Sequence, residues 1–239
     1  MIGIKYEGRL GNCLLQYSAA RIFALKHGLN IDPATNYHIS KMSHDLVNLV
    51  TEGVEHKSGL LNLVDQNYIE LMNCEVIPHS GYIVSVSFQY PEFLLEYKER
   101  IKETIKLDGL EKENDSLLVH MRLGDCDNSP RRLPLEYYDD AISRINFKEG
   151  YICSDTLDHP DVIFLKEKYD LKLLDLHPSD ILKNAERFDN LVLSEGTFSW
   201  WLGVLANAKR ILINKRLRAH QWHGDIFVYP EWEPTNFCD

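Results

Sequence analysis

The segment HMRLGD, at His120–Asp125, places charged side chains directly after an apolar run. Arg122 carries a planar guanidinium, which can pair with two oxygens of a diphosphate. His120 can hydrogen-bond a nucleotide base or a phosphate. An ion pair between Arg122 and Asp125 explains the same residues equally well. The segment therefore indicates either an anion-binding site or a structural ion pair.

A second segment, SEGTFSWW at Ser194–Trp201, supplies hydroxyl groups on Ser194, Thr197 and Ser199. They fall where an apolar run gives way to a helical pattern, and the free N–H groups of a helix start suit a phosphate. One of these hydroxyls is equally explained as a helix N-cap. Among the aromatic residues, we place Phe198 at the site and assign the tryptophans to the core.

A third segment, GRLGN at Gly8–Asn12, also joins a short apolar run to a helical pattern. Gly11 lets the backbone approach a ligand closely, Arg9 adds positive charge, and Asn12 offers an amide that both donates and accepts. Most glycine-rich turns are only turns, so this segment predicts a phosphate or sugar contact only in combination with the others.

Asp125 and Asp127 flank Cys126 in a pattern that could hold a hard cation between two carboxylates. Because Arg122 already supplies positive charge, a divalent ion would be redundant, and we predict no metal and no cofactor. A second group of possible metal ligands is interpreted as surface or packing: His220, Trp222, His223 and Asp225.

The chain of 239 residues carries a formal charge of −10 and is 44% hydrophobic. This allows one large domain or two small ones with real cores. The acidic balance, without a basic run, argues against nucleic-acid binding. Five cysteines without a CxxC pair argue against a disulfide framework, and no stretch reaches the ~20 apolar residues that cross a bilayer. We therefore expect a soluble cytoplasmic protein without a signal peptide or transmembrane segment.

In the second half of the chain, short apolar runs alternate with helical patterns, which is typical of βαβ units around a parallel sheet. The predicted strands are Leu117–Met121, Tyr151–Cys153, Lys172–Leu174, Asn190–Leu193 and Arg210–Ile213, and the predicted helices are Leu135–Ile145, Pro160–Tyr169, Ser179–Arg187 and Thr197–Ala206. Such sheets bind ligands outside the carboxyl ends of their strands. His120–Asp125, Ser154–Asp155 and Ser194–Ser199 all fall at those ends.

The first half is less regular. We predict strands at Ile2–Lys5 and Tyr82–Ser87, and helices at Gly11–His27, Ser40–Thr51 and Pro91–Ile105. The polar stretch Asp108–Asp115 is the preferred domain boundary. The sequence thus predicts an α/β protein of two lobes, residues 1–108 and 109–239, facing a central cleft. The first lobe is small and irregular, and a tail beginning at His220 packs back across the lobes.

Taken together, these segments resemble the α-1,2-fucosyltransferase family, within the fucosyltransferase superfamily of GT-B fold. The family pattern runs roughly GGLGNQ-x-x-QYA, H-x-RRGD, YY-x-x-AI, FSDD and SNSTFSWW. Its counterparts here, in the same order, are GRLGNCLLQYSAAR at Gly8–Arg21, HMRLGD at His120–Asp125, LPLEYYDDAI at Leu133–Ile142, YICSD at Tyr151–Asp155 and LVLSEGTFSWWLGVL at Leu191–Leu205, with GYIVSVSFQYPEF at Gly81–Phe93 as a further matching segment. The fold it implies is GT-B-like, with two Rossmann-like lobes.

The resemblance implies an inverting, metal-independent transfer of a deoxy sugar from a nucleotide-diphospho-sugar to a glycan hydroxyl. Arg122 would hold the diphosphate, with the hydroxyls of Ser194, Thr197 and Ser199 lining its pocket. His120, Ser154 and Asp155 would lie near the nucleoside, and Gly11 and Asn12 would approach donor and acceptor from the other lobe.

Several departures from the family pattern leave the donor open. Glu195 replaces the amide of SNST, Thr156 replaces the second carboxylate of FSDD, and Leu123 replaces the second arginine. A carboxylate suits the N–H groups of guanine, so the loss of the one that Thr156 replaces leaves GDP-fucose and a UDP- or dTDP-linked rhamnose as alternatives. Glu195 either restores the carboxylate contact or binds the ribose hydroxyls. The same departures leave open a non-catalytic nucleotide- or carbohydrate-binding module.

Sugar transfer with inversion also needs a general base for the acceptor hydroxyl. The carboxylates placed to serve are Glu7, Asp125 and Asp127. Asp125 is equally explained as a residue that orients Arg122, and Glu7 as plain surface. The sequence does not choose among them.

Overall fold

The computed structural model describes residues 1–32, 61–77, 81–84, 88–214 and 225–235. The chain divides into two compact units, one of Met1–Leu107 with Trp222–Ile226 and one of Asp108–Gln221 with Phe227–Asp239. The predicted helix at Ser40–Thr51 and the group around His220 fall largely outside the described residues. None of the described helices has the length and apolar character needed to span a bilayer.

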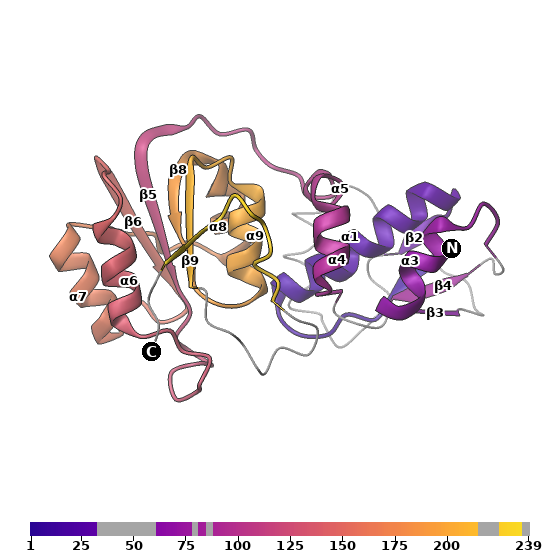
Figure 1. Ribbon diagram of the computed structural model, residues 1–239, viewed down its shortest axis with the longest axis horizontal. Helices are drawn as coiled ribbons and strands as arrows, with labels where there is room; N and C mark the ends of the chain where they lie inside the picture. Colours follow the sequence, from indigo (N-terminus) through magenta and orange to yellow (C-terminus); the bar gives the residue numbers. More distant parts are fainter. Residues whose placement is uncertain (33–60, 78–80, 85–87, 215–224, 236–239) are drawn as a thin grey trace. The chain divides into compact units, whose positions relative to one another are not determined.

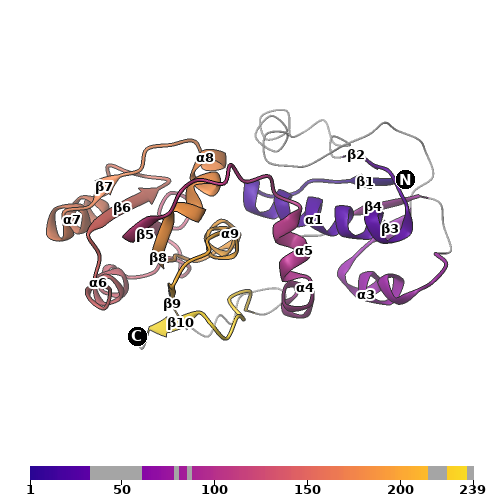
Figure 2. The same cartoon turned by 90° about the horizontal axis from the view of Figure 1, so that it is seen from above.

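The first unit is built on a four-stranded parallel sheet of order β2-β1-β4-β3. Figure 1 labels β2, β3 and β4, and Figure 2 labels all four strands. Its strands are β1 Ile2–Ile4, β2 Ile31–Asp32, β3 Leu61–Leu63 and β4 Tyr82–Val84, and its described helices are α1 Leu10–His27, α3 Asp65–Asn73, α4 Pro91–Glu96 and α5 Lys98–Glu103. The predicted helix at Gly11–His27 is confirmed as α1. The sequence did not predict β2, β3 or α3, which are short or weakly periodic.

The second unit is built on a six-stranded sheet of order β10-β9-β8-β5-β6-β7, parallel throughout. Its strands are β5 Glu113–Met121, β6 Glu149–Ser154, β7 Lys172–Leu173, β8 Phe188–Val192, β9 Arg210–Asn214 and β10 Glu233–Thr235. Its helices are α6 Leu135–Ser143, α7 Pro160–Tyr169, α8 Pro178–Lys183, the 3-10 turn η2 Asn184–Arg187 and α9 Thr197–Leu205. Figure 2 shows α6 and α7 on one side of the sheet and α8 and α9 on the other.

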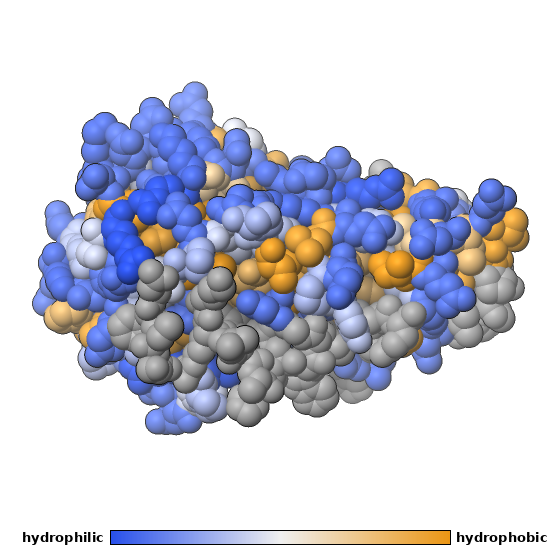
Figure 3. All heavy atoms as spheres, viewed as in Figure 1, coloured by the Kyte–Doolittle hydropathy of each residue, from blue (hydrophilic) through white to orange (hydrophobic). Residues whose placement is uncertain are grey.

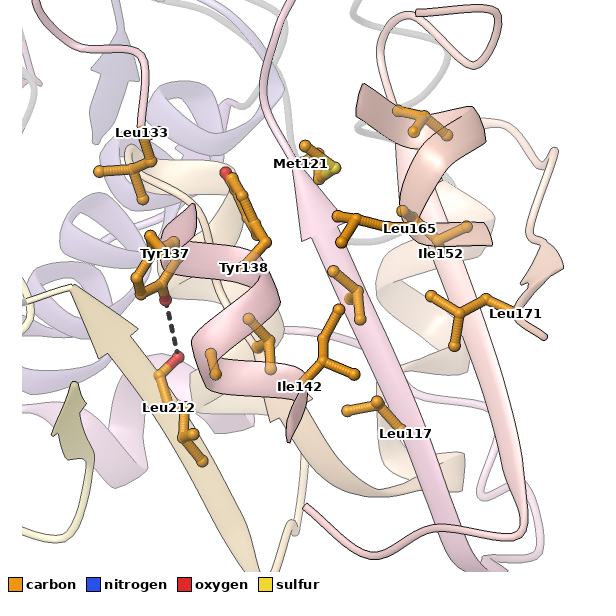
Figure 4. Packing of buried hydrophobic residues seen from close by; sticks show 14 of the residues in the cluster. Leu117, Met121, Leu133, Tyr137, Tyr138, Ile142, Ile152, Leu165, Leu171 and Leu212 are labelled. Carbon is orange, nitrogen blue, oxygen red and sulfur yellow. Dashed lines mark hydrogen bonds between the residues drawn. The ribbon is translucent and has the colours of Figure 1, made fainter. Parts of the chain in front are cut away.

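The alternation of side chains along β5 explains this two-sided cover. Leu117, Val119 and Met121 are fully buried in a core cluster formed with α6 and α7 (Figure 4). Because successive side chains of a strand point to opposite faces, Leu118 and His120 face the other layer. Burial of each such aliphatic side chain stabilises the fold by about 1.5–3 kcal/mol. The packing therefore turns His120 toward α9.

Several predicted elements differ from the structure in their extent, and the following differences have a clear physical cause. The helix predicted at Pro91–Ile105 is interrupted at Tyr97, whose buried ring packs on Phe93. β5 begins at Glu113, inside the predicted linker, because Glu113 pairs with Phe188 of the neighbouring strand. The end of the helix predicted at Ser179–Arg187 is the 3-10 turn η2.

The C-terminal stretch, expected to lack periodicity, contributes β10 to the second sheet. Glu233 pairs with Leu212 of β9, and its carboxylate accepts from Nε of Arg210 at 2.8 Å and from Nη2 at 2.7 Å. A three-residue strand carries too little pattern to be predicted locally, whereas a bidentate ion pair fixes its register. Figure 3 shows hydrophilic residues over most of the visible described surface, with hydrophobic patches among them.

Candidate functional site

The carboxyl ends of β8, β5 and β6 carry the predicted residues of the second unit. These strands are parallel neighbours, with Val119 opposite Val192 and Met121 opposite Ser154. The segments that follow them, beginning at Arg122, Asp155 and Leu193, therefore leave the same edge of the sheet. The structure brings the three segments together, as the sequence predicted.

Arg122 is held in place by Asp125 through two parallel hydrogen bonds. Its Nε donates to Oδ1 of Asp125 at 3.0 Å, and its Nη2 donates to Oδ2 at 2.7 Å. Burial by itself lowers the pKa of the Arg122 guanidinium, but the hydrogen bonds and negative charge of Asp125 outweigh it, so the pKa is raised. The site thus contains a permanent cation with one edge already engaged.

Gly196 provides the space that the other edge of this guanidinium occupies. Its backbone has φ 98° and ψ 170°, a conformation that residues with a side chain rarely adopt. A Cβ atom at this position would overlap Nη1 of Arg122 and lie 3.4 Å from its Cζ. No role was predicted for Gly196, although the glycine in SEGT, where the family pattern has serine, was the available signal.

Asp155 holds the loop that carries Arg122. Its Oδ1 accepts the backbone N–H of Leu123 at 2.8 Å and that of Gly124 at 3.0 Å. Next to it, Ser154 Oγ accepts the N–H of Thr156 at 3.1 Å. The nucleoside contact predicted for Asp155 stays a prediction, and the structure adds a loop-fixing role to it.

Ser194 lies between the Arg122 loop and α6. Its buried Oγ accepts the backbone N–H of Arg122 at 3.2 Å and the hydroxyl of Tyr138 at 2.8 Å. The adjacent Tyr137 donates to the carbonyl of Leu193 at 2.7 Å instead. Neither tyrosine was predicted to have a role at the site, because no local pattern in LPLEYYDDAI indicates that Tyr138 contacts Ser194.

His120 meets the start of α9. Its Nδ1 lies 2.6 Å from Oγ of Ser199, and its ring centroid lies 5.1 Å from that of Phe198. His120 and Ser199 are buried, whereas Phe198 is half-buried. Thr197, half-buried, is the first residue of α9, and Glu195 precedes it as a buried carboxylate. Of the three predicted hydroxyl residues, Ser199 is therefore hydrogen-bonded to His120.

The two aspartates of Asp125-Cys126-Asp127 have separate partners. Asp127 Oδ1 lies 2.8 Å from Nη1 of Arg132 and 3.2 Å from Nε2 of His159. Asp125 pairs with Arg122 instead. Within the parts of the chain that the structure describes, no three histidine, cysteine or acidic side chains form a group that could hold a metal ion.

The predicted residues of GRLGN belong to the first unit. Exposed Arg9 precedes α1, Gly11 is buried in its first turn, and Oδ1 of Asn12 accepts from Nε2 of Gln89 at 3.3 Å. Glu7 is exposed, with its Oε1 3.1 Å from Nζ of Lys5. A common cleft between these residues and the Arg122 site stays a prediction.

No protein-family model and no curated protein matches the sequence. Among solved structures, the chain is similar to the crystal structure of fucosyltransferase NodZ from Bradyrhizobium. The TM-score is 0.57 over 88% of this chain and 94% of that chain, at 13% sequence identity. The chain shares the fold of a fucosyltransferase. The predicted α/β class with parallel sheets is confirmed at this level, and identity this low carries no assignment of donor or acceptor.

Proposed function

We propose that the protein is a glycosyltransferase that moves a deoxy sugar from a nucleotide-diphospho-sugar to a glycan hydroxyl, with inversion and without a metal ion. The observation that carries this proposal is the fixed Arg122 guanidinium at the carboxyl ends of three parallel strands, beside buried Ser194. Sheets of this type bind nucleotides at that edge. The fold shared with a fucosyltransferase supports the same chemistry and makes GDP-fucose the first donor to test.

In this mechanism, the acceptor hydroxyl attacks the anomeric carbon as the bond to the diphosphate breaks on the opposite side. The leaving group gains negative charge, and a cation already oriented toward it lowers the barrier without further reorganisation. Arg122 supplies that cation. Its raised pKa keeps the guanidinium charged at every pH at which the fold survives.

We assign Asp125 to positioning and Glu7 to base catalysis. Both carboxylate oxygens of Asp125 accept from Arg122, and Asp127 is engaged by Arg132 and His159. Glu7 is a candidate base whose side chain is 56% exposed and whose Oε1 lies 3.1 Å from Nζ of the exposed Lys5. An exposed carboxylate accepts the proton of a hydroxyl that comes within hydrogen-bond reach, which is the role we propose for Glu7.

The test is donor turnover and nucleotide binding in the Arg122→Ala variant. We expect kcat/KM to fall by about 100-fold or more, since removal of one preorganised group that stabilises developing charge costs about 10²–10³. Arg144→Ala is the matched control, because Arg144 pairs with Asp140 on the surface of the same unit. Undiminished turnover in Arg122→Ala would overturn the proposal. Binding of GDP or UDP without release of nucleotide from any sugar donor would instead identify a non-catalytic module.

A further inference from the structure

Tyr138 is a buried phenol whose hydroxyl points at the site rather than at the core. Its OH donates to Oγ of Ser194 at 2.8 Å, and the ring is fully buried against the cluster under α6 (Figure 4). Burial raises the pKa of Tyr138, and the smaller opposing effects of Ser194 and the Arg122 backbone amide do not offset it. The phenol therefore keeps the proton that it donates to Ser194.

Ser194 Oγ accepts a second hydrogen bond, from the backbone N–H of Arg122 at 3.2 Å. A serine hydroxyl has two acceptor lone pairs and one hydrogen. With Tyr138 and Arg122 donating to the oxygen, both lone pairs are engaged and the hydroxyl hydrogen has to be donated elsewhere. The two contacts therefore fix the polarity of Ser194, which can only donate to a further partner.

We propose that Tyr138 is a positioning residue that sets Ser194 as a hydrogen-bond donor to the phosphate oxygens held by Arg122. This inference rests on the proposed function, because it needs an anion at the Arg122 site. An anionic oxygen accepts only, so a hydroxyl locked as a donor suits it better than one free to rotate. Without Tyr138, the Ser194 hydroxyl regains its rotational freedom.

The sequence supplies a matched control in the neighbouring tyrosine. Tyr137 is also buried in α6, but its hydroxyl donates to the backbone carbonyls of Leu193 and Leu212, at 2.7 and 3.3 Å. Tyr137→Phe and Tyr138→Phe thus each remove one buried hydroxyl, and only the second touches Ser194.

The experiment measures inorganic pyrophosphate and GDP binding by calorimetry, together with donor KM and kcat. We expect Tyr138→Phe to weaken pyrophosphate binding and raise the donor KM by about 3- to 10-fold, the range for one hydrogen bond. Tyr137→Phe should leave both unchanged. In a Ser194→Ala background, Tyr138→Phe should cause no further loss, because the group it orients is gone. Thermal unfolding of each variant reports separately on stability.

The role of Tyr138 would be overturned if both tyrosine variants weakened pyrophosphate binding equally. It would also be overturned if the loss caused by Tyr138→Phe added fully to the loss caused by Ser194→Ala. Arg122→Ala separates this outcome from failure of the proposed function. If Arg122→Ala abolishes pyrophosphate binding while Tyr138→Phe does not weaken it, the anion site stands and only the role of Tyr138 is wrong. If the wild-type protein binds neither pyrophosphate nor GDP and releases nucleotide from no sugar donor, both proposals are wrong.

Discussion

Replacing Gly196 by alanine is expected to displace the Arg122 guanidinium from its site. The added Cβ would overlap Nη1 of Arg122, and ordinary van der Waals contact begins at 3.4 Å. The guanidinium would therefore have to shift by about 1 Å. Such a shift breaks the paired geometry with Asp125, whose hydrogen bonds are 3.0 and 2.7 Å long.

Two effects set the expected losses of activity and stability in Gly196→Ala. A misplacement of about 1 Å in a catalytic group can cost about 100-fold in rate, or about 2.7 kcal/mol of transition-state stabilisation. The backbone at φ 98° adds strain for any residue with a side chain. That strain is about 1–3 kcal/mol and lowers stability rather than catalysis. The expected result is a loss in kcat/KM of about 100-fold with a fall in Tm of several degrees.

The assay is donor turnover at saturating acceptor, with thermal unfolding of the same samples. Gly28→Ala is the matched control, because Gly28 also has a positive φ, of 62°, but a Cβ there would meet no atom within 4 Å. It should lower Tm and leave kcat/KM unchanged. If Gly196→Ala lowers Tm but keeps wild-type kcat/KM, the guanidinium does not need the position that the structure gives it, and the reasoning is refuted.

Three further changes test other contacts. Gly203→Ala should destabilise by about 1–3 kcal/mol despite the better helix propensity of alanine, because its Cβ would lie 2.6 Å from the Trp232 ring; a raised Tm would contradict this packing. Asp189→Asn should destabilise at pH 7 in urea unfolding, since lysine and amide partners lower the pKa of Asp189. The ionised Asp189 stabilises the folded protein at pH values above its unfolded pKa, and this stabilisation is lost as the pH falls through the folded pKa. The free energies of unfolding of wild type and variant should therefore converge in acid. A difference in free energy that persists there would contradict the prediction. Donor turnover in EDTA should equal turnover in buffer, because Arg132 already neutralises Asp127. A loss of turnover in EDTA that Mn²⁺ restores would show that the reaction needs a metal ion.

Much of the second unit could be predicted because its elements are long and strongly patterned. The pattern at Pro160–Tyr169 begins with a proline and ends at Asp170 in the left-handed conformation, so α7 has the predicted bounds. The parallel arrangement follows from alternation of strands and helices. β10 could not be predicted, since the pairing of Glu233 with Leu212 and Arg210 joins residues more than 20 positions apart.

In the candidate site too, some features could be predicted from the sequence and others could not. The residue types at the strand ends, including Arg122, Asp155 and Ser194, were evident from the sequence. Their partners were not: Leu123 and Asp155 are 32 positions apart, and Tyr138 and Ser194 are 56 apart. Asp125 could be a base, a metal ligand or an orienting residue until both its oxygens were found on Arg122.

The sequence by itself determined the alternation of strands and helices from β5 to β9 and which chemical groups follow β5, β6 and β8. These depend on local periodicity and composition, which any short window of the chain contains. Only the tertiary structure decided what each group does there. Parallel register brings distant backbone and side-chain atoms within hydrogen-bond distance, and it also set the space at Gly196 and the polarity of Ser194. Hydrogen bonds act over about 3 Å, so their partners are known only once the strands are placed side by side.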